Sequence, residues 1–393
     1  MQDESLAAWK EDLGKGLREL EQRHQRRSLS EIRGTDFCSN DYLGLSRHRA
    51  LREAVVCAVE KANRMSGTGS RLLSGHSEEW RTLEEEFAEF AGTEAALFFS
   101  SGYAANVGML AALVGKDDVV YSDVLNHASL IDGMRLSAAR KVIYPHLNLS
   151  ALEESLRQDA GAPWRRLIIT ESVFSMNGDV APLTEMAALA EKYGAAMIVD
   201  EAHATGVQGP EGRGLVVENG ILPHVLATIH TCGKALASAG AFVCGPAVLK
   251  EYLINHARTF IFSTALPPYF AEQIRAALRL ARRMDAERQE LLRRAEQFVL
   301  ALNREGFDTD GSTSQIVPVV LGRNQETLKA AAHLQNEGFA VRAIRPPTVP
   351  SGQSRLRLSL TALIAEEELM RLVGSLVKWR EAGSLVAAKP GTA

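Results

Sequence analysis

Lys234 is the residue of this chain with the clearest chemical use. It stands in the segment HTCGKA (residues 230–235), directly after the apolar run 225–229, which is typical of a short buried strand. Small residues surround it, so its amine lies close to the backbone and can lose its hydration. Desolvation disfavours the charged form and leaves a better nucleophile for a carbonyl carbon. A Schiff base with pyridoxal phosphate (PLP) requires such an amine, whereas the alternative is a surface lysine in a glycine-bearing turn.

Other polar groups follow further predicted strands. Asp200 ends a buried run, where its carboxylate could pair with a protonated ring nitrogen and keep the cofactor an electron sink. His203 could bond the phenolic oxygen of the ring, and His127 could stack on it. The segment SSGY (residues 100–103) offers backbone N–H groups at a helix start, as phosphate sites do. Taken singly, each has a structural alternative: a capping aspartate, a core histidine, a residue of a helix N-terminus and an ordinary N-cap.

The elements that carry these residues alternate between strand and helix from about residue 95 to residue 245. Such alternation predicts an α/β fold, with a mostly parallel sheet flanked by helices on both faces. Ligands then bind beyond the carboxyl ends of the strands. We therefore expect the lysine, the aspartate and the helix start at one edge of the sheet. The strands are predicted at 95–99, 119–121, 141–144, 167–170 and 196–199, and the helices at 100–114, 127–136, 149–158 and 182–193.

Four segments are predicted along the chain. They are an N-terminal helical segment (1–45), a large PLP-binding α/β domain (46–270), a smaller α+β C-terminal domain (271–383) and a disordered tail (384–393). A single long helical stretch over about 272–304 leads into the C-terminal domain. The strands of that domain are expected at 315–321, 340–344 and 355–360, and its helices at 327–337 and 366–378.

Composition narrows the class of protein. The chain has 393 residues, 46% hydrophobic and 23% charged, and its net charge of -4 disfavours a nucleic-acid partner. No apolar run is long enough to span a bilayer, and the acidic N-terminus is unlike a signal peptide. The four cysteines are scattered without zinc-type pairing, so we expect no metal site, reduced thiols and a cytoplasmic protein.

Over roughly residues 39–376 the chain resembles the α-oxoamine synthase family of fold-type I PLP enzymes. The segments SNDYLGL (39–45), FSMNGD (174–179), DEAHATG (200–206) and TCGK (231–234) look like family signatures. The segment AIRPPTVP (343–350) looks like the signature of the branch that uses a pimeloyl thioester. The resemblance implies a PLP-dependent acyltransferase that condenses L-alanine with pimeloyl-CoA or pimeloyl-acyl carrier protein, with loss of CO2, in biotin biosynthesis.

The resemblance also implies roles for individual residues. Lys234 would form the Schiff base, with His127, Asp200 and His203 as the other catalytic residues. The remaining cofactor contacts would be Gly102, Tyr103, Ser175 and Thr231, with Ser263 and Thr264 from the second subunit of a homodimer. The substrate contacts would be Arg23, Asn40, Ser70, His127, Thr348 and Arg357. A guanidinium such as that of Arg357 suits a carboxylate because it donates two hydrogen bonds to it.

Two of the substrate contacts have their own alternatives. Relatives that take glycine, the 5-aminolevulinate synthases, carry threonine where Ser70 stands, and serine would leave room for the β-carbon of alanine. The alternative is that Ser70 only caps its loop. Arg23 belongs to a basic cluster that the sequence alone favours as a solvated helix end over a contact to an anionic substrate. For the whole chain, the alternatives are another α-oxoamine synthase, such as a glycine C-acetyltransferase, and a non-catalytic PLP-fold subunit.

Overall fold

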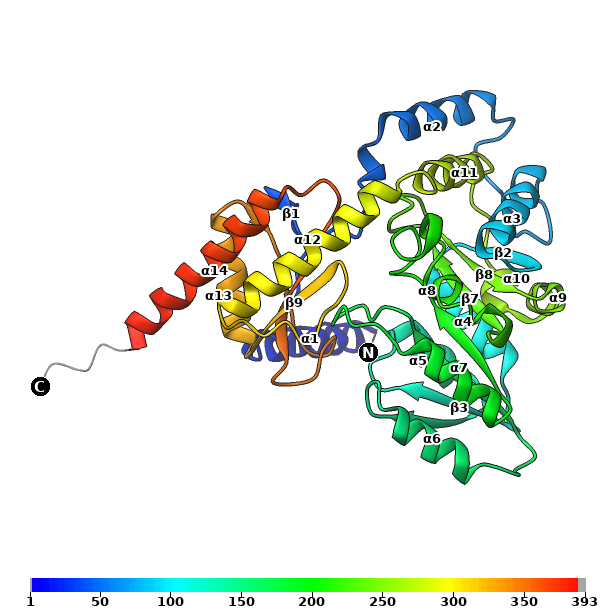
Figure 1. Ribbon diagram of the computed structural model, residues 1–393, viewed down its shortest axis with the longest axis horizontal. Coiled ribbons are helices and arrows are strands. Elements are labelled where there is room, and N and C mark those ends of the chain that lie inside the picture. Colours follow the sequence, from blue (N-terminus) through cyan, green and yellow to red (C-terminus); the bar gives the residue numbers. More distant parts are fainter. Residues whose placement is uncertain (1, 388–393) are drawn as a thin grey trace, which may run out of the picture.

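The computed structural model describes residues 2–387, and its larger lobe is built on a seven-stranded sheet (Figure 1). The strand order is β2-β8-β7-β6-β5-β3-β4, and β8 is antiparallel to both of its neighbours while the other pairs are parallel. The predicted mostly parallel sheet is therefore confirmed. The strands are β2 (Ala95–Phe99), β3 (Asp118–Asp123), β4 (Arg140–Tyr144), β5 (Arg165–Glu171), β6 (Ala195–Asp200), β7 (Ala227–Thr231) and β8 (Ala241–Gly245).

Helices cover both faces of this sheet. Because side chains alternate along a strand, Leu97 and Phe99 of β2 enter one core while Ala96 and Phe98 enter the other. The first core packs against α4 (Gly102–Leu113), α5 (Ala128–Leu136), α9 (Ala247–His256) and α10 (Arg258–Ile261). The second packs against α3 (Glu78–Ala91), α6 (Leu149–Gln158) and α7 (Leu183–Lys192). The short elements η2 (Pro210–Gly212), α8 (Leu215–Glu218) and η3 (Leu222–His224) connect β6 to β7.

The smaller lobe holds a three-stranded antiparallel sheet of order β11-β12-β9. Its strands are β9 (Ile316–Gly322), β11 (Ala343–Ile344) and β12 (Ser354–Ser359). Its helices are α12 (Asp285–Arg304), α13 (Asn324–Asn336) and α14 (Glu366–Ala387), and in Figure 1 the yellow α12 runs from the large lobe into the smaller one. The division of the chain into four segments remains a prediction.

Several predicted boundaries were wrong. The stretch 272–304 is two helices, α11 (Tyr269–Ala281) and α12, because α11 packs on α2 (Arg49–Lys61) and α3 of the large lobe while α12 packs on α14 and β9. The strand before Lys234 is β7, which starts two residues later than expected and includes Thr231. The run 340–344 is split between β10 (Phe339–Ala340) and β11, which belong to different sheets. Residues 384–387 continue α14, and the rest of the expected tail lies outside the described residues.

The N-terminal segment crosses between the lobes. Helix α1 (Gln2–Gln22) is amphipathic as predicted, yet its apolar side chains are exposed, including Trp9 at 67%. The chain then pairs β1 (Thr35–Asp36) with β10 of the smaller lobe before η1 (Leu45–Arg47) and α2 (Arg49–Lys61) return it to α11. Within residues 2–387, none of the helices combines the length and apolar character needed to cross a bilayer.

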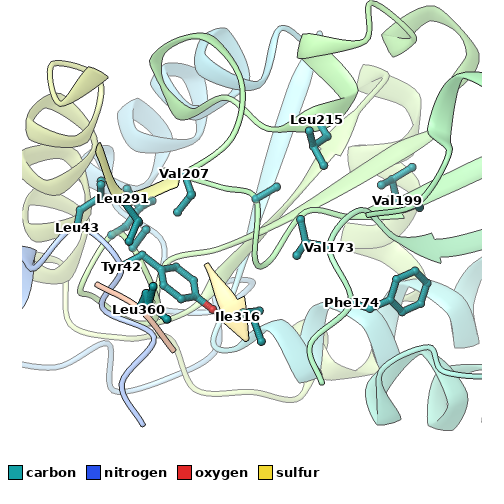
Figure 2. Close-up of a cluster of buried hydrophobic side chains, with 14 of the residues drawn as sticks. Tyr42, Leu43, Val173, Phe174, Val199, Val207, Leu215, Leu291, Ile316 and Leu360 are labelled. Atoms are coloured by element: carbon teal, nitrogen blue, oxygen red, sulfur yellow. The ribbon is translucent and has the colours of Figure 1, made fainter. Parts of the chain in front are cut away.

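One turn ties the two lobes together, and we call residues 172–181 the bridging hairpin. Val173 pairs with Val180, and the Phe174 N–H donates to the carbonyl of Asp179 at 3.0 Å. Val173 of the hairpin and Ile316 of β9 belong to one hydrophobic core, which continues from one lobe into the other (Figure 2). At the tip, Gly178 has φ 74°, and a Cβ there would collide with the Ile316 carbonyl. The hairpin can reach β9 this closely only with glycine at 178.

Gly178→Ala should therefore destabilise the protein by more than the cost of a left-handed backbone alone. Gly220→Ala is the matched control, because Gly220 has φ 66° and open space where its Cβ would go. The control carries only backbone strain, whereas the collision at 178 should add about 1–3 kcal/mol. Urea unfolding of both variants measures the difference, and equal destabilisation would show that the hairpin and β9 part without cost.

Candidate active site

A cavity of about 310 Å³ opens at the carboxyl ends of the parallel strands, and it brings most of the predicted site residues together. Strands β5, β6 and β7, the start of α4 and the turn before α5 each contribute to its wall. Of the residues singled out from the sequence, those that line it are Asn40, Gly102, Tyr103, His127, Asp200, His203, Thr231 and Lys234. This is the sheet edge at which α/β proteins bind ligands.

Lys234 begins a chain of hydrogen bonds through His203 to Tyr42. The Lys234 Nζ lies 3.0 Å from His203 Nε2, and His203 Nδ1 lies 2.6 Å from the Tyr42 hydroxyl. Burial, opposed by the charges of Asp200 and Glu171, lowers the pKa of Lys234 to about 8. Burial and the nearby Lys234 hold the pKa of His203 well below its usual value, so its imidazole is neutral. A protonated Lys234 then donates to Nε2, which leaves the imidazole proton on Nδ1.

Asp200 is held by two donors, one of which the sequence did not reveal. Its Oδ1 accepts the Ala202 N–H at 2.9 Å, and its Oδ2 accepts the Asn106 side-chain N–H at 2.7 Å. Asn106 lies in α4, four residues after its first residue, and also donates to Ser129. Only the packing of α4 across the sheet places this amide beside the carboxylate, so no local sequence signal could identify it.

Glu171 is the second residue that sequence reasoning missed. It is the last residue of β5 and lies level with Asp200 in the parallel register. Burial and the nearby Asp200 raise the pKa of Glu171 to about 8. Its Oε2 accepts the Ser175 N–H at 3.2 Å, while its buried Oε1 has no partner among the described residues. A neutral carboxylic acid therefore stands in the cavity wall beside the Asp200 carboxylate.

Arg357 reaches the site from the smaller lobe. Its Nε donates to the Ser175 carbonyl at 2.5 Å, and its NH1 donates to Asn40 Oδ1 at 3.1 Å and to Ser359 at 2.5 Å. Ser175 thus contributes its backbone rather than its hydroxyl to this arrangement. The charge of Arg357 acts on both Lys234 and His203, which places the guanidinium at the same site.

Five predicted contacts lie away from this cavity within the described chain. Ser70 forms an isolated bridge with Thr264, and Ser263 and Thr264 line a separate small pocket. Thr348 accepts a hydrogen bond at 3.1 Å from Arg27, not from Arg23. The Arg23 side chain is exposed, and its carbonyl accepts a hydrogen bond from Asn324.

The cavity fits a phosphorylated pyridine aldehyde. The first N–H groups of α4 have no partner inside the helix and face the cavity at Gly102 and Tyr103. A Cβ at Gly102 would crowd the Thr231 methyl, so the helix start and the end of β7 form a close cradle. His127 caps α5, and its partly buried ring lines the same cavity. An amine for the aldehyde, a carboxylate for the ring nitrogen and a phosphate cradle are therefore all present.

Cys232 lies between the phosphate cradle and the lysine in sequence but not in the cavity. Its side chain is fully buried in the core beneath β7, and burial raises the pKa of its thiol far above the usual value. In the segment TCGK, the lysine side chain therefore lines the cavity and the cysteine side chain lies in the core.

Comparison with known proteins shows to which family this chain belongs. The model of the aminotransferase class I and II family matches residues 32–376. The 8-amino-7-oxononanoate synthase of Geobacter sulfurreducens is 46% identical over 92% of this chain and 96% of its own length. The enzyme of the same name from Methylococcus capsulatus is 45% identical over 87% of this chain and 88% of its own length.

Solved structures agree with the sequence relatives. An 8-amino-7-oxononanoate synthase from Francisella tularensis is 29% identical, with a TM-score of 0.78 over 89% of this chain and 99% of its own. A serine palmitoyltransferase of S. paucimobilis, whose structure holds PLP and myriocin, is 27% identical, with a TM-score of 0.88 over 97% and 99% of the two chains. The chain therefore belongs to the aminotransferase class I and II family of PLP-dependent enzymes, in the α-oxoamine synthase branch and among its 8-amino-7-oxononanoate synthases.

Proposed function

We propose that this protein condenses L-alanine with a pimeloyl thioester, of CoA or of an acyl carrier protein, and releases CO2, the free thiol of the carrier and 8-amino-7-oxononanoate. The observation that carries the proposal is the convergence of Lys234, Asp200 and His203 in one cavity with Arg357 beside it. An amino acid held there by its carboxylate would present its α-carbon to the lysine amine. The residue roles that follow are part of this proposal.

Each group has a task that its surroundings support. Bound PLP supplies an electron sink for the charge left at the substrate α-carbon. Lys234, whose pKa of about 8 lies near neutrality, takes the α-proton and later returns one. Asp200, fixed by Asn106, would hold the pyridine N–H of the bound cofactor. Arg357 and Asn40 orient the carboxylate, which is the group lost as CO2.

The alternatives differ in what the site must contain. A non-catalytic PLP-fold subunit would not need the lysine, the aspartate and both histidines, and all four are here. Glycine C-acetyltransferase and serine palmitoyltransferase share the same chemistry and differ in the two substrates. Sequence supports the oxononanoate synthases, because relatives of that name reach 42–48% identity to this chain over 86% of its length or more.

A substrate matrix tests the proposal: glycine, L-alanine and L-serine against acetyl-, succinyl-, pimeloyl- and palmitoyl-CoA, measured by CoA release. We expect L-alanine with pimeloyl-CoA to be the preferred pair.

Lys234→Ala should fold yet lose turnover by at least about 10⁴-fold, because the covalent attachment point and the general base are removed together. The wild-type protein with PLP should be yellow and bleach with borohydride. A colourless protein, or an active Lys234→Ala variant, would contradict the mechanism.

We further propose that the enzyme is a homodimer whose partner contributes Ser263 and Thr264 to the phosphate site. Within one chain both residues lie outside the active-site cavity. Family resemblance assigns them to the cofactor, so a second subunit would have to supply them. Sedimentation at assay concentration should give a dimer. An active monomer would count against the assignment.

Ser70→Thr tests the choice of amino acid. Ser70 pairs with Thr264, so in the proposed dimer it would accompany Thr264 to the site of the second subunit. There the added methyl should lie where the β-carbon of alanine must go, and one methyl in a tight pocket discriminates by about 10- to 200-fold. The kcat/KM for L-alanine should therefore fall by about that factor relative to glycine. Ser74→Thr, in the same loop, is the matched control, and equal losses for both amino acids would show that Ser70 only supports its loop.

A further inference from the structure

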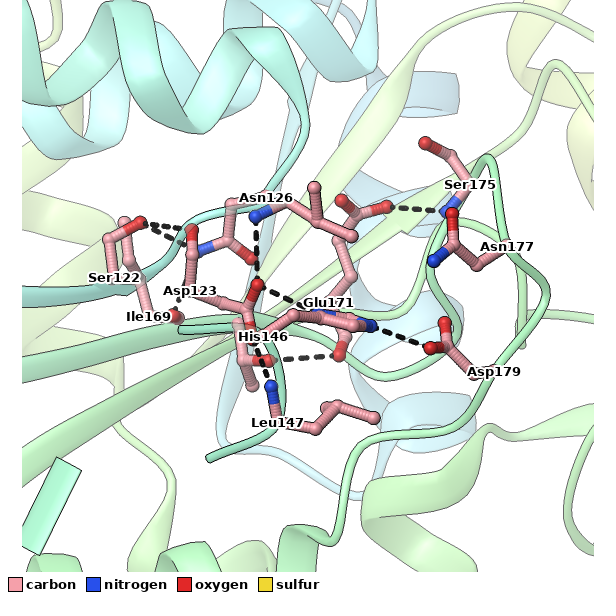
Figure 3. A network of polar contacts seen from close by, with 12 residues as sticks. Ser122, Asp123, Asn126, His146, Leu147, Ile169, Glu171, Ser175, Asn177 and Asp179 are labelled. Carbon is pink, nitrogen blue, oxygen red and sulfur yellow. Dashed lines mark hydrogen bonds and ion pairs between the residues drawn. The ribbon is translucent and has the colours of Figure 1, made fainter. Parts of the chain in front are cut away.

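His146 connects two loops that flank the active-site cavity (Figure 3). Its Nδ1 lies 2.9 Å from Asp123 Oδ1, and its Nε2 lies 2.6 Å from Asp179 Oδ2. Asp123 ends β3, four residues before His127, and Asp179 belongs to the bridging hairpin. One imidazole thus joins the turn that carries His127 to the hairpin that contacts Arg357.

The two aspartates differ in how much they depend on His146. Asp123 also accepts the backbone N–H groups of Leu125 and Leu147, both at 2.8 Å. The other oxygen of Asp179, Oδ1, is buried and has no hydrogen-bond partner within residues 2–387. Among the described side chains, His146 is therefore the only one that holds the Asp179 carboxylate of the bridging hairpin.

The surroundings of His146 favour a proton on both ring nitrogens. Asp123 faces it from β3 and Asp179 from the bridging hairpin, while the ring of Phe174 meets it edge-on at 4.5 Å. Tyr144, two residues before His146 at the end of β4, stays neutral because burial and the charge of Asp123 raise the pKa of its phenol. Burial alone would lower the pKa of His146, but hydrogen bonds to both aspartates outweigh it and raise the pKa to about 9.

The opposite side of the bridging hairpin binds the smaller lobe. The Ser175 carbonyl accepts from Arg357, and Asn177 Oδ1 accepts from Arg355 at 2.9 Å. Any movement of the hairpin would therefore move Arg357 relative to Lys234. We propose that His146 is a positioning residue, which locks the bridging hairpin to the end of β3 and so sets where Arg357 holds the carboxylate of the amino acid. This inference rests on the proposed function, because it takes Arg357 as the carboxylate-binding residue.

The first test measures the binding of L-alanine to the PLP-loaded enzyme through the change in the enzyme's visible absorption. An imidazolium donates from two nitrogens that point apart, whereas both N–H donors of glutamine lie on one nitrogen, so His146→Gln should lose one of the two contacts. We expect it to weaken L-alanine binding by about tenfold, as small displacements of binding groups do. The KM for the thioester should change less than twofold. His224→Gln, at an exposed histidine 3.9 Å from Glu191, is the matched control and should bind L-alanine as the wild type does.

The second test uses pH and does not depend on His146→Gln folding. The contact of His146 with both Asp123 and Asp179 needs the protonated imidazole, so it is intact at neutral pH and is lost as pH rises through about 9. In Asp179→Asn the new amide can donate to a neutral Nε2 while Nδ1–H still donates to Asp123. The alkaline loss of L-alanine affinity in the wild type should therefore be smaller in Asp179→Asn.

The outcomes separate the inference from the function on which it rests. If the wild type does not bind L-alanine, the proposed function fails. If the wild type binds and His146→Gln binds equally well, or if Asp179→Asn keeps the full alkaline loss, His146 does not position Arg357. A labelled-histidine NMR titration of the loaded wild-type enzyme should place the pKa of His146 near 9, and a value near 6.5 would overturn the charge argument.

Discussion

The parallel register of β5 and β6 is the constraint on which the site depends. It sets Glu171 level with Asp200, and Asp200 level with Ile229 of β7, so two carboxyl groups end side by side at one edge. Two adjacent charges in a buried place are costly, and the outcome is a division of roles: Asp200 receives two donors, while burial beside it favours the neutral form of Glu171. A one-residue slip of either strand would turn these side chains to the other face of the sheet.

The second requirement is that the two lobes meet with fixed spacing. The amine of Lys234 is on the large lobe and the guanidinium of Arg357 is on β12 of the smaller lobe. These residues are far apart in sequence, so the packing of the two lobes must set the distance between them. The bridging hairpin does so through close backbone contact at Gly178 and through the carbonyl of Ser175. A turn held by backbone hydrogen bonds fixes this distance more precisely than a flexible loop, because its backbone moves less.

Sequence predicted the elements whose signal is local. The alternating runs gave the parallel sheet, and the residues after β6 and β7 marked the cavity edge. It failed where packing decides. The break between α11 and α12 contains neither Gly nor Pro, and β8 is a short apolar run (AFVCG) that pairs antiparallel between β2 and β7. Asn106, Glu171 and His146 act through partners distant in sequence, so a single chain without its register could not reveal them.

Cys232 shows how burial decides which nucleophile a carbonyl compound meets. A thiolate is intrinsically more reactive than an amine, and one exposed two residues from Lys234 would compete for the same aldehyde. The core beneath β7 keeps this sulfur protonated and out of reach. Chemoselectivity in the segment TCGK is thus a property of which way each side chain faces, and not of the residues' inherent reactivity.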